Sequence, residues 1–294
     1  MENKARNGVE QRDAFFLQRF CVPTNVLIRQ RRRFGFNRIA MNSLQTCHAD
    51  SSQFMVAQAR DEPYSRDAMC ERYVIADQAA VEREFRLARP WWQFSSSFNV
   101  STHRNVPVIR MHQGDAEGVV MRWGLIPAWA EGDPLKACAT HAASEGIERS
   151  RLFGDAWRHS QRCILPASGF YGWQLTPDRH RQPYFVRLVN RSVFGFAALW
   201  DRSVMKEEDD IIEGCALITV PPNPLLAEVH NTFGRMPAIL RRDDYELWLT
   251  APPAKATSLL RTYPQDGMVT HAVSPRVNSL QSDDELLIRP AHFS

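Results

Sequence analysis

The 294-residue sequence has few cysteines, and it lacks the glycine-rich and His/Cys motifs that indicate a bound cofactor. Its six cysteines are scattered, and no two are spaced as CxxC. A disulfide framework usually shows denser cysteines in a shorter secreted chain, so we expect free thiols in a reducing cytoplasm. No P-loop, GxGxxG fingerprint or zinc-ligand spacing occurs. We therefore expect no bound metal and no cofactor, nucleotides included.

Long apolar runs are also missing. No stretch of about 18 apolar residues exists, so we expect neither a membrane span nor a membrane partner. The opening residues MENKARNGVEQRD mix acidic with basic side chains, and no apolar stretch of a secretory signal follows, which favours a cytoplasmic location. With 44% hydrophobic and 23% charged residues, the composition is typical of a soluble globular protein that is long enough for a full core.

Residues 1–68 differ from the rest of the chain in composition and pattern. They show no sustained helix or strand periodicity, and they hold eleven Lys and Arg against seven Asp and Glu. Their net charge is therefore about +4, whereas that of the whole chain is +3, which leaves residues 69–294 near −1. A basic run such as Arg29–Arg33 can bind nucleic acid, although charged blocks are more often solvated tails. We expect an extra segment over 1–68, either disordered or a mis-assigned upstream translation, and one domain over 69–294.

From Cys70 onward, many short strand patterns alternate with a few helical ones. A β-branched and aromatic strand signal occurs in RYVIA (72–76), and a helix with an N-cap is predicted over 77–88. Residues 182–190 and 193–202 are predicted to form a hairpin. The whole pattern predicts an α+β domain with a mainly antiparallel, partly barrel-like β-sheet and a few flanking helices.

Eight sequence blocks follow one another along residues 69–294. They are MCERY (69–73), FNVSTHRNVPVIR (98–110), MRWGLIPAWA (121–130), HAASEG (141–146), RCILPASGFYGW (162–173), AALWD (197–201), HNTFGRMPAIL (230–240) and VSPRVN (273–278). In this order they resemble the SOS-response-associated peptidase family, whose members act as abasic-site processing proteins. The family motifs include MCGRY, MRWGLIPSWA, NARSET, RCLIPADGFYEW and HxRMP. The resemblance implies the fold of that family, and the segment before Met69 has no counterpart in it.

The family chemistry depends on a cysteine that becomes N-terminal when the preceding methionine is removed. The resemblance assigns this role to Cys70, which follows Met69. An N-terminal cysteine is a 1,2-aminothiol, which condenses with the aldehyde of an abasic site and closes to a thiazolidine ring. Its α-amine has a pKa of about 8, so part of it is neutral at physiological pH. Because this chemistry needs a free α-amine, we expect translation to begin at Met69. On composition alone, Cys70 would instead be a small buried hydrophobic residue.

Three further positions are candidates for catalysis by family resemblance. His230 stands at the histidine of HxRMP and would transfer protons, although a three-residue insertion separates it from Arg235. His141 replaces the asparagine of NARSET, and a histidine can still donate a hydrogen bond. Glu145 belongs to the same block, in which Ala143 replaces an arginine that contacts DNA in the family.

A carboxylate of the family site is missing at its usual place. Gly172 stands where GFYEW has a glutamate, and general acid–base groups typically contribute about 10²–10⁴-fold in rate. Glu71, Glu145 and His141 are the residues that could replace it. Glu71 itself stands where MCGRY has glycine. It either supplies the missing acid–base group or repels the DNA backbone.

The resemblance also indicates residues that contact DNA. Asn99 matches a family asparagine near the reacting cysteine, where an amide would orient the α-amine or hold a sugar oxygen. Arg72, Arg110 and Arg122 are candidates for phosphate contacts. Trp123 is a candidate for stacking on a base beside the abasic gap. The alternatives are a turn role for Asn99 and core packing for Trp123.

Three functions follow from these patterns. The first is an abasic-site processing protein that captures abasic sites in single-stranded DNA covalently through Cys70. It would have a thiol-peptidase and lyase-like activity, weakened at Gly172 and Ala143, and would act as a nucleoid-associated monomer. The second is a single-stranded DNA-binding module of the same fold that forms no crosslink. The third is a cysteine peptidase that uses Cys70 and His230.

Overall fold

The structure is a computed structural model that describes residues 71–87, 92–205 and 210–291. The segment predicted over 1–68 lies outside these ranges, as does Cys70. None of the helices in the described ranges is long and apolar enough to cross a membrane.

Five strands close into a barrel. Their pairing order is β3–β4–β10–β9–β6, and β6 pairs again with β3. The five are β3 (Asn105–His112), β4 (Asp115–Trp123), β6 (Arg162–Ala167), β9 (Phe194–Val204) and β10 (Ile211–Val220). The short strands β5 (His141–Ala143) and β11 (Met236–Pro237) pair with β10. Most pairs are antiparallel, whereas β10 runs parallel to β4 and β5. The predicted partly barrel-like, mainly antiparallel sheet is therefore confirmed.

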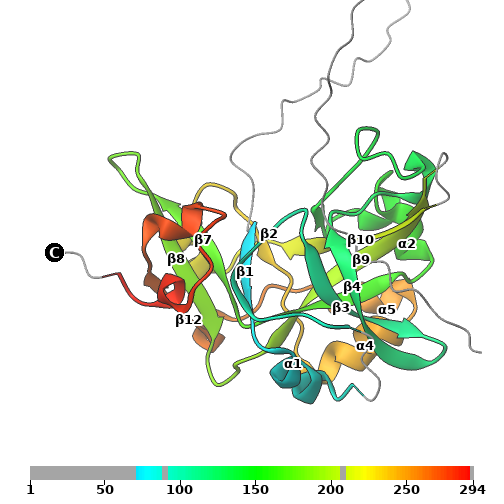
Figure 1. The fold of residues 1–294 in the computed structure, drawn as a ribbon, viewed down its shortest axis with the longest axis horizontal. Helices are drawn as coiled ribbons and strands as arrows, with labels where there is room; N and C mark the ends of the chain where they lie inside the picture. Colours follow the sequence, from blue (N-terminus) through cyan, green and yellow to red (C-terminus); the bar gives the residue numbers. More distant parts are fainter. Residues whose placement is uncertain (1–70, 88–91, 206–209, 292–294) are drawn as a thin grey trace, which may run out of the picture. The chain divides into compact units, whose positions relative to one another are not determined.

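A second, five-stranded sheet is antiparallel throughout, in the order β12–β8–β7–β1–β2. Its strands are β1 (Arg72–Ile75), β2 (Ser97–Ser101), β7 (Gly169–Leu175), β8 (Arg181–Leu188) and β12 (Met268–Ala272). Only Ser168 separates β6 of the barrel from β7 of this sheet. In Figure 1, β1 and β2 lie between β7 and the barrel strands. The N-terminal end of the described chain is thus a central strand of this sheet, not an edge.

The hairpin predicted over 182–190 and 193–202 is wrong. β8 pairs with β7 and β12, whereas β9 pairs with β6 and β10, so the two strands belong to different sheets. The burial of each strand explains the difference. β9 begins with a continuous buried run that needs cover on both faces, which the barrel supplies, while β8 alternates between buried and exposed positions. Strands adjacent in sequence therefore separate here because they require different environments.

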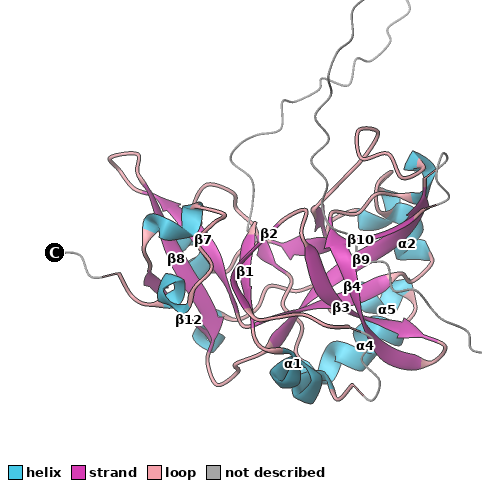
Figure 2. Ribbon diagram, in the orientation of Figure 1, coloured by secondary structure: helices cyan, strands magenta, loops and turns pink. Residues whose placement is uncertain are grey.

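Short helices flank the sheets, as Figure 2 shows. The α-helices are α1 (Gln78–Phe85), α2 (Gly154–Arg158), α3 (Pro224–Val229), α4 (Tyr245–Thr250) and α5 (Pro253–Thr257). The 3₁₀-helices are η1 (Ala128–Ala130), η2 (Ile147–Arg149), η3 (Arg242–Asp244), η4 (Gln265–Gly267), η5 (Pro275–Asn278) and η6 (Glu285–Ile288). Asp77 caps α1 by accepting a hydrogen bond from the Ala80 N–H at 3.0 Å, as the sequence predicts. The α+β class is confirmed.

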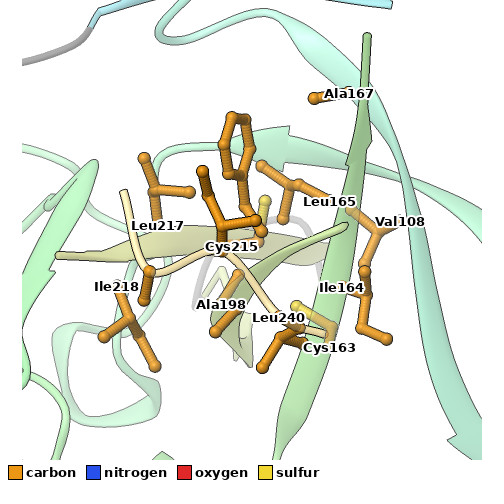
Figure 3. Packing of buried hydrophobic residues seen from close by; sticks show 14 of the residues in the cluster. Val108, Cys163, Ile164, Leu165, Ala167, Ala198, Cys215, Leu217, Ile218 and Leu240 are labelled. Carbon is orange, nitrogen blue, oxygen red and sulfur yellow. The ribbon is translucent and has the colours of Figure 1, made fainter. Parts of the chain in front are cut away.

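Buried side chains from all five barrel strands and from neighbouring elements form the main core, part of which is shown in Figure 3. Cys163 on β6 and Cys215 on β10 lie in this core, each 0% exposed, and burial raises the pKa of both thiols. They are structural core residues. Cys138, by contrast, is only half-buried and lies in a loop.

A buried arginine joins α4 to the barrel. Arg162 on β6 is 1% exposed, and its guanidinium donates hydrogen bonds to the Trp248 carbonyl at 2.6 Å and to the Ala251 carbonyl. Burial without an acidic partner within hydrogen-bond distance lowers the pKa of Arg162 to about 10. These two carbonyls lie at the C-terminal end of α4, where helix carbonyls lack intrahelical partners.

We predict that Arg162→Met lowers the free energy of unfolding by about 3 kcal/mol, because two buried carbonyl oxygens lose charged donors. Urea denaturation followed by tryptophan fluorescence measures this change. The matched control is Arg158→Met, since the exposed Arg158 guanidinium bonds Asp155 and the Glu148 carbonyl at the surface. The control is expected to change stability by less than about 1 kcal/mol. Equal stability of both variants would contradict the role given to Arg162.

Candidate functional site

A small pocket lies beside the start of β1. One of its lining residues, Glu71, directly follows Cys70 in the sequence. The pocket has a volume of about 240 Å³ and is lined by Glu71, Arg72, Trp173, Arg181, His230, Thr232, Phe233 and Asn278. These residues come from β1, β7, β8, the end of α3, the loop that follows it and η5. A larger cavity of about 600 Å³, lined by Phe85, Met111 and Tyr245 among others, contains none of the predicted site residues. The smaller pocket is therefore the candidate site.

His230 is the most constrained side chain of this pocket. It follows the last residue of α3, it is 2% exposed, and its ring stacks on Phe233 with centroids 5.5 Å apart. Nδ1 accepts a hydrogen bond from the Trp173 N–H at 3.1 Å, so in the neutral ring the proton is on Nε2. Nε2 is buried and has no partner among the residues that the structure describes. His230 therefore has one unused N–H donor in the pocket it lines.

The loop after His230, which contains the insertion, is fastened to β7. Asn231 accepts a hydrogen bond from the Leu175 N–H at 2.9 Å and donates one to the Leu175 carbonyl at 3.0 Å, which fastens the loop to β7. Gly234 has φ +58°, the left-handed region in which glycine is favoured. Thr232 and Phe233, two residues of the longer loop, become part of the pocket wall.

Two side chains from the start of β1 line the pocket. Glu71 is half-buried, and burial raises the pKa of its carboxyl, which the positive charge of Arg72 partly opposes. The Arg72 guanidinium donates to Asn99 Oδ1 at 3.0 Å and to the Val277 carbonyl at 3.1 Å. Arg72 is thus held in place, and a carboxyl and a guanidinium directly follow the predicted nucleophile in the sequence.

Asn99 lies beneath Arg72 as a structural support. It is 7% exposed, and its amide donates to the carbonyls of Val277, Ser279 and Ser282 at 3.3, 2.9 and 2.7 Å. Its amide oxygen accepts from Arg72. These bonds occupy both ends of the amide. The prediction that Asn99 contacts a substrate remains untested, and the geometry gives it the role of fastening residues 277–282 to β2.

His141 and Glu145 do not line this pocket. Arg235 donates to both carboxylate oxygens of Glu145, at 3.1 and 2.7 Å, and this pairing lowers the pKa of the carboxyl. Such a group is ionised at neutral pH and is poorly suited to donate a proton. His141 on β5 lies 2.9 Å from the Thr140 hydroxyl, with its ring 5.7 Å from that of Trp123. The pocket therefore brings together His230, Glu71 and Arg72. His141 and Glu145 lie outside it.

The remaining DNA-contact candidates lie elsewhere. Arg110 is held by Glu117 at 2.7 Å and Glu213 at 2.8 Å, which leaves little of its charge for a phosphate. The Nε atom of Arg122 is buried, without a partner among the described residues. Trp123 is 1% exposed and packs edge-on against the Tyr73 ring at 5.4 Å, so its face is closed to a base. Core packing, the alternative considered for Trp123, is the observed arrangement.

Sequence patterns did not single out Arg181, Thr232, Phe233 or Asn278. Asn278 accepts a hydrogen bond from the Trp173 indole N–H at 2.8 Å, and it ends the VSPRVN block, so that block contained a signal. Arg181 lies in no block, and only the pairing of β8 with β7 brings it to the pocket. In the described ranges, no group of three His, Cys, Asp or Glu side chains gathers in a way that could hold a metal ion.

Comparison with known proteins agrees with the geometry of the fold. Residues 69–280 match the sequence profile described as SOS response associated peptidase (SRAP). The chain belongs to this family. The abasic site processing protein YoqW of Bacillus subtilis is 29% identical over 226 residues, which cover 75% of this chain and 99% of YoqW. YoaM of the same organism, also named an abasic site processing protein, is 30% identical over 236 residues, which cover 76% of this chain and 100% of YoaM. A crystal structure of a protein from Bacteroides thetaiotaomicron matches this chain with a TM-score of 0.69 at 22% sequence identity. The match covers 76% of this chain and 100% of that protein, and it shows that the two share a fold.

The depressed pKa of His230 makes stability depend on pH. Burial, with a smaller contribution from Arg181, lowers the pKa of His230 from 6.5 to about 4. Between these values the unfolded chain binds a proton that the folded chain does not. Stability is therefore expected to fall, by on the order of 3 kcal/mol, as the pH drops from 6.5 to 4. Chemical denaturation across this pH range should show a shallower decline for His230→Gln than for the wild type. The same exchange at exposed His112 is the control, and parallel slopes for wild type and His230→Gln would contradict the assignment.

Asn99→Asp should loosen the loop that Asn99 fastens. The carboxylate still accepts from Arg72, but it faces three carbonyl oxygens that lose their donors. We expect a loss of about 2 kcal/mol in stability and faster amide hydrogen exchange over residues 277–282. Asn105→Asp, at an exposed position on β3, is the control. Unchanged exchange in this loop would indicate that Asn99 serves another purpose.

Proposed function

We propose that this protein captures abasic sites in single-stranded DNA through a covalent bond to Cys70. The observation that carries the proposal is the pocket beside Glu71, in which the buried Nε2–H of His230 lacks a partner among the described residues. Cys70 is joined to Glu71 by one peptide bond. A buried donor without a partner is costly, so it favours a ligand with an acceptor atom. The family membership and the names of the two relatives agree with this substrate.

An abasic sugar offers the groups that this pocket accepts. Its open form has an aldehyde at C1′ and a hydroxyl at C4′. The α-amine of an N-terminal Cys70 attacks the aldehyde, water leaves, and the thiol closes a thiazolidine ring. A neutral His230 donates its Nε2–H to a sugar oxygen and lowers the energy of ring opening. Because its pKa is about 4, the ring stays neutral at physiological pH and retains one proton on Nε2.

Local charge supports DNA binding more than the charge of the whole domain does. Residues 69–294 carry a net charge near −1, so they give no general attraction to phosphates. Arg72 and Arg181 both line the pocket, next to an abasic nucleotide placed there. We infer that affinity rests on few phosphate contacts and decreases only moderately with salt.

The tautomer of His230 favours capture over a protein-cleaving cysteine peptidase. A Cys–His peptidase needs an imidazole nitrogen that accepts the thiol proton. Here Nδ1 already accepts from the Trp173 N–H, and Nε2 holds the proton of the neutral ring. The peptidase activity that the family name implies would then be the removal of residues before Cys70, which exposes the α-amine.

Incubation with single-stranded DNA that contains one abasic site tests the proposal. The 294-residue chain and a chain that begins at Met69 are compared, and mass spectrometry identifies the N-terminal residue of each. We expect a band that survives denaturation wherever Cys70 is N-terminal. Cys70→Ala should abolish this band, and Cys138→Ala, in a half-buried loop, should retain it.

The same gel separates the alternatives. Binding without a denaturation-resistant band, from a chain with N-terminal Cys70, would support a DNA-binding module and contradict covalent capture. Crosslinking by a chain with residues 1–69 still attached would contradict the need for the α-amine.

A further inference from the structure

We infer that Glu71 supplies the acid–base carboxyl of the capture reaction, and that it reaches the pocket from β1 because its cross-strand neighbour on β7 is Gly172. This inference rests on the function proposed above and names the group that moves its protons. It depends on strand register, on the space around Gly172 and on the charges that surround the pocket.

The register of β1 and β7 is set by two pairs. Tyr73 pairs with Phe170 and Val74 with Gly169 in an antiparallel ladder. If this register is extended by two residues, to the position just before β1, Glu71 falls across from Gly172. Directly opposed residues project from the same face of a sheet, with Cβ atoms about 5 Å apart. Side chains at positions 71 and 172 would therefore project into the same region beside the sheet.

This region lies against His230. A Cβ atom added to Gly172 would stand 3.1 Å from the Val229 carbonyl oxygen and 3.2 Å from the His230 Cβ. A side chain at 172 would therefore press on the end of α3. Glycine at 172 avoids this contact, and Glu71 lines the same pocket as His230. The family motifs MCGRY and GFYEW place glycine and glutamate the other way round, so the two residue types have exchanged strands here.

The surroundings of Glu71 suit a carboxyl that gives and takes a proton. The charged or titratable groups that share its pocket are Arg72 on β1, Arg181 on β8 and His230 after α3. Burial raises the pKa of Glu71, and Arg72 only partly opposes this. By contrast, the Glu145 carboxylate is held ionised by Arg235. Among the alternatives considered for the missing acid, Glu71 alone lines the pocket.

The proton transfers balance with no external reagent. The Cys70 amine adds to the C1′ aldehyde and forms a carbinolamine. The Glu71 carboxylic acid protonates the hydroxyl of this adduct, the C–O bond breaks, water leaves and an iminium ion remains. The Glu71 carboxylate then takes the thiol proton, and the thiolate adds to the iminium carbon. The products are a neutral thiazolidine, one water molecule and Glu71 in its starting protonated form.

The decisive measurement is the rate of crosslink formation, in the form of the chain whose N-terminus is Cys70. We expect Glu71→Gln to slow this rate by about 10²-fold and to remove an inflection from its pH profile, with Glu71→Asp retaining part of the rate. Glu228→Gln, on the exposed face of α3 and outside the pocket, should behave as the wild type. DNA affinity is measured in parallel. A Gln variant that crosslinks as fast as the wild type, or faster because it binds DNA more tightly, would overturn the inference.

The exchange of residues gives a second test. Glu71→Gly should form the crosslink as slowly as the Gln variant does. Adding Gly172→Glu should restore part of the crosslinking rate, because it returns a carboxyl to the same region of the pocket. The restoration is incomplete because the end of α3 must shift by a few tenths of an ångström to admit the side chain. A double variant whose crosslinking rises above that of Glu71→Gly would therefore support the shared role of these positions.

A direct titration checks the carboxyl independently of catalysis. In the 294-residue chain with ¹³C-labelled glutamate, the signal that Glu71→Gln removes should titrate above the usual value near 4.5. An ordinary titration would overturn the inference. A wild type that never crosslinks would overturn both the proposed function and this role, whereas a crosslinking wild type with an unaffected Gln variant would overturn only the role of Glu71.

Discussion

The candidate site depends on the pairing of β1 with β7. This ladder is anchored by Tyr73 and Phe170, a cross-strand pair whose rings both pack edge-on against Phe196 of the barrel, at 6.2 and 5.8 Å. Because Tyr73 is fixed there, the residues just before it must run toward the end of α3. A slip by one residue would move the Glu71 side chain to the other face of the sheet, away from His230. The packing of two aromatic rings thus fixes where the residues before Tyr73 meet the pocket.

One backbone hydrogen bond then sets the chemistry of the histidine. The Trp173 N–H occupies Nδ1, so the geometry of β7 fixes the tautomer of a side chain that belongs to α3. Burial keeps the ring neutral, and the loop over 231–234 is fastened to the same strand by Asn231. β7 therefore organises both sides of the pocket. It supplies Gly172, which avoids a clash with the end of α3, and the N–H that orients His230.

Charged groups outside the pocket have a different use. Arg110 with its two glutamates stabilises barrel strands, and Arg235 with Glu145 and Thr219 joins β11 to β10 and the segment after β5. Arg162 serves the end of α4. These arginines bond to groups of the protein itself, although Arg162 Nη1 has no partner among the described residues. Arg72 differs because it is both held by Asn99 and placed in the wall of the pocket.

The sequence by itself determined the family, the α+β class and the ends of several elements, because these depend on local patterns. Asp77 begins α1 through a bond to a residue three positions away, and the ordered motif blocks needed no knowledge of contacts. The candidate nucleophile Cys70 and its partner His230 also followed from motifs. The division of β8 and β9 between two sheets did not, since neighbouring strands in sequence need not pair.

Only the tertiary structure decided which polar residues share a site. Trp123 and Arg110 resembled DNA contacts in sequence but became a core residue and a paired cation, because burial and ion pairing depend on distant strands. Glu71 and Gly172 are about a hundred positions apart, and no local pattern relates them. The register of β1 and β7, extended to Glu71, brings the two positions together, and on this basis we infer that two departures from the family motifs form one exchange of a carboxylate.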